Sequence, residues 1–192
     1  MSRIFITAAH AATPADIATA RLGNRFGRMD LASQLALLAV EPMAAQLGNF
    51  AADRIGLVIG AVAGSLSTDA AYWSGHATAG GLSPTLFIYT LPSSIIGELS
   101  IRHKITGPGL CSVGANAPLL DESAALLRSG EADAVICANI QVISTPLAAL
   151  LQQPEAAVAH ALLLERHGPG LREWHQNDRD IKQVFATLRA QI

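Results

Sequence analysis

The apolar residues of this chain form two kinds of run. Short continuous runs are typical of buried strands, whereas apolar positions three or four residues apart indicate the buried side of a helix. The continuous runs predict strands at residues 4–7, 54–60, within 105–114 and at 134–138, with a further apolar run at 157–164. The spaced runs predict helices at residues 30–48, from Ser93 or Ser94 to Ile101, at 115–129 and around 181–188.

Capping residues mark the expected ends of these helices. Asp30 is a suitable N-cap for the first helix and Gly48 a suitable stop. Pro118 is suited to the first turn of the helix at 115–129, and Gly130 ends it. The apolar side of the helix that follows Ser94 is expected to contain Ile95, Ile96, Leu99 and Ile101. Strands that alternate with helices predict an α/β domain with a mixed, mostly parallel sheet flanked by helices.

Length and composition add a statement about partners. The chain has 192 residues, of which 51% are apolar and only 15% are charged. This length predicts one domain, residues 1–192, with a core of its own. Because about a quarter of the residues of an average domain are charged, the low value here favours an apolar surface that a homo- or hetero-oligomer covers.

The charge pattern argues against several classes of function. Thirteen basic and fifteen acidic residues give a net charge of −2, without the basic stripe of a nucleic-acid-binding protein. The uncharged stretches 70–97 and 134–154 are interrupted by Pro and polar residues, so we expect no membrane span. With two cysteines and no hydrophobic signal region, a reduced, cytoplasmic protein is expected.

The sequence predicts no metal and no cofactor. None of the six histidines has the spacing of a metal-ligand set, with another histidine or with a cysteine. Glycine is plentiful, but neither a Walker loop nor a GxGxxG motif between a strand and a helix is present.

A strand-to-helix junction at 113–118 has the geometry that favours a thiolate, because the free N–H groups of a helix N-terminus stabilise negative charge. The residue at the expected helix entrance is Asn116, whose amide is a poor nucleophile. Cys111 is the nearest thiol, and the competing interpretation is a small buried side chain. A small acyltransferase or condensing enzyme that uses Cys111 is therefore one alternative function.

Five segments are informative in their order along the chain: Arg28–Leu37, Arg54–Gly60, Leu91–Ile101, Ile105–Pro108 and Gly130–Val135. In this order they resemble the N-terminal half of a β-ketoacyl synthase, a member of the thiolase superfamily, over roughly residues 1–170. The resemblance implies the N-terminal half of a thiolase-like layered fold, in which helices sandwich the sheets. It also implies that strands near Gly107-Pro108 pair across a dimer interface.

The departures from this family affect its catalytic residues. Where a β-ketoacyl synthase has Ala-Cys-Ala, this chain has Ala115-Asn116-Ala117, and a gapped alignment would place Val113 there instead. Both alignments remove the acyl-accepting cysteine. The two catalytic histidines of the family belong to its C-terminal half, which we expect this chain to lack. The resemblance therefore implies a subunit without catalytic residues of its own.

Chain-length factors are ketosynthase-like subunits of this kind. The resemblance implies a heterodimer with a full-length β-ketoacyl-ACP synthase, which meets the acyl carrier protein, and a role in shaping the acyl tunnel. The sequence resembles a truncated member of this class, similar to the partner subunits of bacterial aryl polyene pathways. Phe87, Tyr89 and Leu91 fall where the family lines the partner's acyl pocket, with ordinary core residues as the competing interpretation; Cys111, Val113 and Asn116 complete the candidate tunnel and interface residues. A purely structural scaffold for a ketosynthase is a second alternative.

Overall fold

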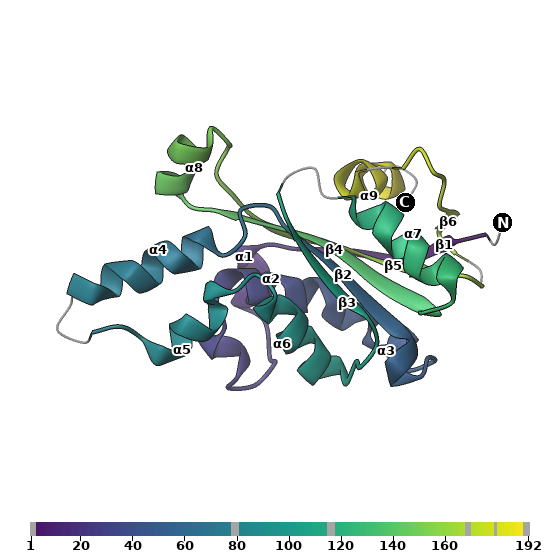
Figure 1. Cartoon of the computed structure of the whole chain (residues 1–192), viewed down its shortest axis with the longest axis horizontal. Coiled ribbons are helices and arrows are strands. Elements are labelled where there is room, and N and C mark those ends of the chain that lie inside the picture. Colours follow the sequence, from purple (N-terminus) through teal and green to yellow (C-terminus); the bar gives the residue numbers. More distant parts are fainter. Residues whose placement is uncertain (1–2, 78–80, 115–117, 168–169, 179, 190–192) are drawn as a thin grey trace.

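Six strands in the described part of the chain form one mixed sheet (Figure 1). The computed structural model describes residues 3–77, 81–114, 118–167, 170–178 and 180–189. The strands are β1 (Phe5–Ala12), β2 (Ile55–Ala61), β3 (Gly109–Val113), β4 (Ala134–Ile143), β5 (Ala156–Glu165) and β6 (Arg172–Glu173). Their order across the sheet is β3-β2-β4-β5-β1-β6.

The sheet has a parallel part and an antiparallel part. β2 pairs in parallel with β3 on one side and with β4 on the other. The pairs β4/β5, β5/β1 and β1/β6 are antiparallel. The predicted mixed sheet flanked by helices is thus confirmed, but the prediction that it is mostly parallel is wrong, since three of its five strand pairs are antiparallel.

Helices cover both faces of this sheet. The α-helices are α1 (Pro14–Ile17), α2 (Leu31–Val40), α3 (Ala44–Leu47), α4 (Leu66–Ser74), α5 (Pro84–Phe87), α6 (Ser94–His103), α7 (Leu119–Ser129), α8 (Thr145–Leu151) and α9 (Ile181–Arg189). Short 3₁₀ turns are η1 (Phe26–Arg28), η2 (Glu41–Met43), η3 (Ala52–Arg54), η4 (Gly75–Ala77) and η5 (Ile88–Thr90). In Figure 1, α2 and α6 lie on one face, and α7 and α9 lie on the other.

The predicted first helix is interrupted at Pro42. Asp30 caps α2 as expected, since its Oδ1 accepts a hydrogen bond of 3.0 Å from the Ser33 N–H. Proline has no N–H and cannot continue an α-helix, so the chain forms η2 and then α3. Gly48 follows α3 as the predicted stop.

Two other helix predictions need correction. Pro118 is the N-cap of α7 and does not lie in its first turn, because the helix begins at Leu119. The predicted start at Ala115 falls on residues 115–117, outside the described residues. Ile101 is 60% exposed, because it lies two positions after the buried Leu99 and so about 200° around the axis of α6.

The two core layers differ in the segments that close them. On the α2 and α6 face, the core includes Leu35, Leu99 and Tyr89. On the other face, α9 packs beside α7 and buries Ile181, Val184, Phe185 and Leu188, which confirms the predicted terminal amphipathic helix. None of the helices in the described residues is both long and apolar enough to cross a membrane.

Candidate functional site

β3 forms one edge of the sheet, where it pairs only with β2 among the described strands. Most of its residues are half-buried or exposed, and Leu110 and Val113 expose large apolar side chains. An apolar edge strand with unpaired backbone groups is a template for pairing with another chain. This edge is therefore suited to an interface.

The segment that precedes α6 also exposes three apolar side chains. Phe87 at the end of α5, Ile88 in η5 and Leu91 are each about 60% exposed. The end of this segment lies near β3, because a Cβ atom at Gly64 would be 3.5 Å from Cγ of Pro92 and 3.3 Å from Cγ1 of Val113. We call the five side chains of Phe87, Ile88, Leu91, Leu110 and Val113 the edge surface.

Tyr89 belongs to the same segment but points into the chain's own core. It is only 4% exposed, and its hydroxyl donates a 3.0 Å hydrogen bond to Oε1 of Glu98. Burial and this hydrogen bond raise the pKa of Tyr89 to about 12. The three residues predicted together thus divide into two exposed ones, Phe87 and Leu91, and one buried anchor.

Glu98 is a buried carboxylate in the middle of α6, and it has two partners. Arg25, from the loop before η1, donates from Nε and Nη2 to its two oxygens at 2.8 and 2.9 Å. This bidentate contact raises the pKa of Arg25 above its ordinary value. Sequence analysis missed both residues; the available signal was one acidic residue between Ile95 and Leu99 on the apolar side of a helix.

A mainly apolar hollow of about 450 Å³ opens at the carboxyl ends of β2 and β3. Its lining includes Leu66, Asp69, Pro92, Val113 and Leu151. Ligands of open α/β sheets bind at the carboxyl ends of strands, so this position is where a ligand or a partner side chain would be expected.

The two thiols do not have the properties of nucleophiles. Cys111 lies within β3, opposite Ile59 of β2, and burial raises its pKa. Cys137 is fully buried in β4, and burial raises its pKa to about 12. With raised pKa values, both cysteines are protonated at neutral pH. Because the thiolate is the reactive form of cysteine, neither is a ready nucleophile. Asn116, one of the two residues that the resemblance allows at the family's nucleophile position, lies outside the described residues.

The described residues also show no constellation for metal chemistry. No group of three or more His, Cys, Asp or Glu side chains in them could hold a metal ion. The enclosed His103 has its Nε2 3.8 Å from Oε2 of Glu41, and burial lowers its pKa.

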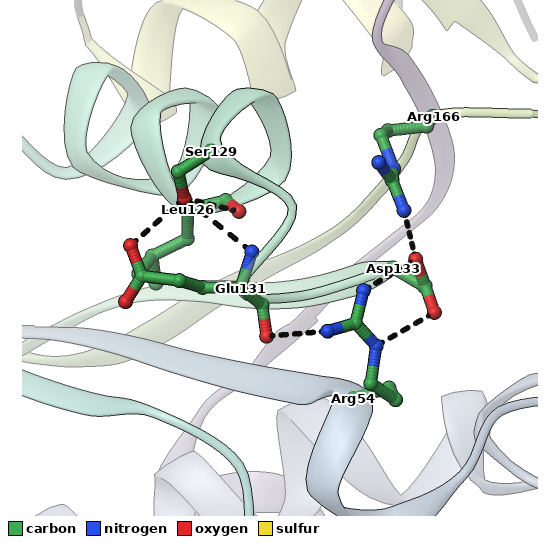
Figure 2. A network of polar contacts seen from close by, with 6 residues as sticks. All are labelled: Arg54, Leu126, Ser129, Glu131, Asp133 and Arg166. Carbon is green, nitrogen blue, oxygen red and sulfur yellow. Dashed lines mark hydrogen bonds and ion pairs between the residues drawn. The ribbon is translucent and has the colours of Figure 1, made fainter.

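A separate polar network joins the starts of β2 and β4 (Figure 2). Arg54 donates from Nε and Nη2 to both carboxylate oxygens of Asp133 at 3.0 Å, and Arg166 also pairs with Asp133. The Asp133 N–H donates to the Arg54 carbonyl at 2.8 Å. Arg54 and Asp133 come from two of the five family-like segments, and their role here is to fasten the sheet together.

Comparisons with known proteins agree with this architecture. The family described as β-ketoacyl synthase, N-terminal domain, matches residues 7–161. No curated protein matches the chain.

Solved structures show the same fold at low sequence identity. One chain of a ketosynthase (ApeO) in complex with its chain length factor (ApeC), from Xenorhabdus doucetiae, superposes with a TM-score of 0.65 and 19% identity over 86% of this chain and 80% of that chain. The ishigamide ketosynthase/chain length factor superposes with a TM-score of 0.67 and 18% identity, over 85% of this chain and 62% of that chain. The AntDE:AntF complex of a type II PKS acyl-carrier protein with its ketosynthase superposes with a TM-score of 0.69 and 18% identity, over 86% of this chain and 62% of that chain.

This chain therefore spans less than two thirds of the matched chain in two of these three structures. The matched Xenorhabdus chain is shorter, because a similar share of this chain covers more of it. The family match extends over most of the sequence, from β1 into β5. The chain therefore belongs to the β-ketoacyl synthase family, and the part that matches is the N-terminal domain of that family.

Proposed function

We propose that this chain is a non-catalytic, chain-length-factor-like subunit. It pairs with an active β-ketoacyl-ACP synthase and helps to shape the tunnel that holds the growing polyketide or aryl polyene chain. The observation that carries this proposal is the edge surface, five exposed apolar side chains on β3 and on the segment before α6; among the described strands, β3 has a partner on one side only.

The edge surface has the properties of a protein interface. Pairing of β3 with a strand of the partner would satisfy its free backbone groups, and the apolar side chains would add to the affinity. Burial of each exposed side chain would contribute on the order of 1 kcal/mol. Phe87, Ile88 and Leu91 would then face the partner from one short segment.

The thiols support a division of labour between the two subunits. Cys111 and Cys137 both have raised pKa values, and the sequence has Asn116 or Val113 at the nucleophile position. Acyl transfer by this family needs a thiolate. The covalent chemistry is therefore assigned to the partner, and the acyl carrier protein meets this chain only through the complex.

The fold supports a single domain over residues 1–192. α9 covers the sheet face beside α7 with four buried apolar side chains, so the described residues close both of their own core layers.

The proposal is tested by co-expression with a ketosynthase that has the catalytic Cys and both His residues. We expect a stable heterodimer, and we expect Phe87→Ala and Leu91→Ala to shift or broaden the product lengths. Leu171→Ala is the matched control, because Leu171 is half exposed but precedes β6 at the opposite edge of the sheet. A chain that stays monomeric with every ketosynthase tested would overturn the proposal.

Two measurements separate the alternatives. A structural scaffold would change the amount of product but not its length. An enzyme that uses Cys111 would become acylated by an acyl thioester, and mass spectrometry of the wild type and Cys111→Ser would detect this adduct. We expect no acylation, because the thiol is half-buried and protonated.

A further inference from the structure

One side chain anchors the segment that carries three of the five side chains of the edge surface. Among residues 81–93, Tyr89 alone is buried, while Phe87, Ile88 and Leu91 are exposed. The neighbouring contacts are weaker in kind. The Ser65 hydroxyl lies 2.9 Å from the Thr90 carbonyl, and the ring of Phe87 meets that of Tyr72 with centroids 5.5 Å apart.

The anchor is fixed through three elements of the fold. The Tyr89 hydroxyl on η5 donates to Glu98 on α6, and Arg25 beside η1 holds the same carboxylate with two hydrogen bonds. Oε1 of Glu98 therefore accepts from both Tyr89 and Arg25, so that movement of either partner disturbs the other. Arg25 is 59% exposed, whereas the Glu98 side chain is 5% exposed. The network reaches from the surface to the interior beneath the exposed segment.

We propose that Tyr89, Glu98 and Arg25 form a positioning network that fixes the direction of Phe87, Ile88 and Leu91, and thereby sets the length of the acyl chain that the partner's tunnel accepts. This inference rests on the proposed function. Tyr89, predicted as a tunnel residue, then acts on the acyl chain indirectly, through the side chains that it positions.

The physical reason is the geometry of a 3₁₀ turn. With about three residues per turn, rotation of η5 about its axis redirects Ile88 together with Tyr89, and it also turns Phe87 and Leu91, which flank η5 in the chain. The aromatic ring of Tyr89 fills its place in the core by shape alone, but the hydroxyl bond to a charged acceptor selects one rotation. Hydrogen bonds to charged groups are stronger and more directional than neutral ones. Their loss would leave the segment packed but free to take several orientations.

The test uses Tyr89→Phe in the heterodimer with its ketosynthase partner. This change removes one oxygen and keeps the ring. We expect the complex to form and the ratio of the main product to its neighbours in length to fall about fivefold, which corresponds to loss of about 1 kcal/mol. Tyr72→Phe is the matched control, since it removes the hydroxyl of the chain's other tyrosine, whose ring also contacts Phe87. The control is expected to keep the wild-type product distribution.

Two further measurements identify the network itself. Glu98→Gln removes the charge to which both Tyr89 and Arg25 donate, so it should broaden the products at least as much as Tyr89→Phe does. The double variant should be no broader than Glu98→Gln alone, because both changes act on one network. Independently of products, a spectroscopic pH titration should show one tyrosine that ionises near pH 12, and this signal should move to lower pH in Glu98→Gln.

The outcomes distinguish the inference from the proposed function. If Phe87→Ala changes the product lengths and Tyr89→Phe does not, the positioning role is wrong and the subunit role stands. If the wild type forms no heterodimer, the proposed function itself fails. If Tyr89→Phe does not pair, Arg25→Lys decides, because it keeps the positive charge and loses the bidentate contact. Broadened products from Arg25→Lys support the network, and wild-type products overturn it.

Discussion

The network around Asp133 and the network around Glu98, in each of which arginine holds a carboxylate, differ in what they hold together. Asp133 lies between Arg54 and Arg166 and joins elements of the sheet to one another (Figure 2). Glu98 lies between Arg25 and Tyr89 and joins the core to a segment with an exposed apolar surface. The first network is closed within the fold, whereas the second ends at the candidate interface.

The two carboxylates also differ in burial, and this decides how much each pair matters. The Asp133 side chain is 36% exposed, so water screens its ion pairs. The Glu98 carboxylate is 5% exposed, and a buried charge without its partner is strongly destabilising. Similar ion pairs therefore have different effects on stability. The screened pairs of Asp133 stabilise the sheet modestly, whereas the buried Glu98 carboxylate depends on Arg25.

The largest effect is expected from Arg25→Ala, which leaves Glu98 buried without its cation. The unfolding free energy should fall by about 2–3 kcal/mol, somewhat less than for a fully buried pair because solvent reaches Arg25. Urea denaturation measures this change. Arg21→Ala is the control, since Arg21 is an exposed arginine of the same loop that donates to the neighbouring Ala20 carbonyl. Equal losses in both variants would contradict the importance of the buried pair.

A smaller, pH-dependent effect is expected at the other network. Hydrogen bonds from Arg54, then from Arg166, lower the pKa of Asp133 from 3.8 to about 2. A carboxyl group with a lowered folded-state pKa stabilises the fold above its unfolded pKa, and this contribution is lost as the pH falls toward the folded value. The contribution should therefore disappear between about pH 4 and pH 2.

The size of this second effect is set by solvent screening. We expect about 1 kcal/mol, because Asp133 is partly exposed. The measurement compares the unfolding free energies of the wild type and Asp133→Asn at several pH values in this window. Their difference should shrink as the pH falls, and a constant difference would show that Asp133 contributes no charge-dependent stability.

The sequence predicted those elements whose burial is periodic or continuous. β2 is buried at every position, and α9 buries Ile181, Val184, Phe185 and Leu188 with helical spacing, so both were found. α4, α5 and α8 were missed because they bury few side chains: Thr68 in α4, Leu147 in α8 and none in α5. A mainly exposed helix gives no hydrophobic period to read.

The candidate site was predicted as a segment but not in its detail. Phe87, Tyr89 and Leu91 were grouped by their position in the chain, and the structure separates Tyr89 because the 3₁₀ turn directs it inward. The partner that fixes this direction could not be read locally, since Arg25 and Glu98 are 73 residues apart in sequence. The edge surface likewise depends on tertiary structure, which brings Val113 beside Pro92.

The smallest effect on stability, and the sharpest contrast with the networks, is expected on the edge surface itself. Leu91→Ser and Val113→Ser should change the unfolding free energy by less than about 0.5 kcal/mol, because both side chains are already exposed. The same variants should weaken the heterodimer about fivefold, as loss of on the order of 1 kcal/mol of apolar burial implies. Urea denaturation and a binding titration measure the two effects, with Leu171→Ser at the opposite edge as the control. If either variant binds the ketosynthase as tightly as this control does, the substituted side chain lies outside the interface. The surface that contacts the partner would then lie elsewhere on the molecule.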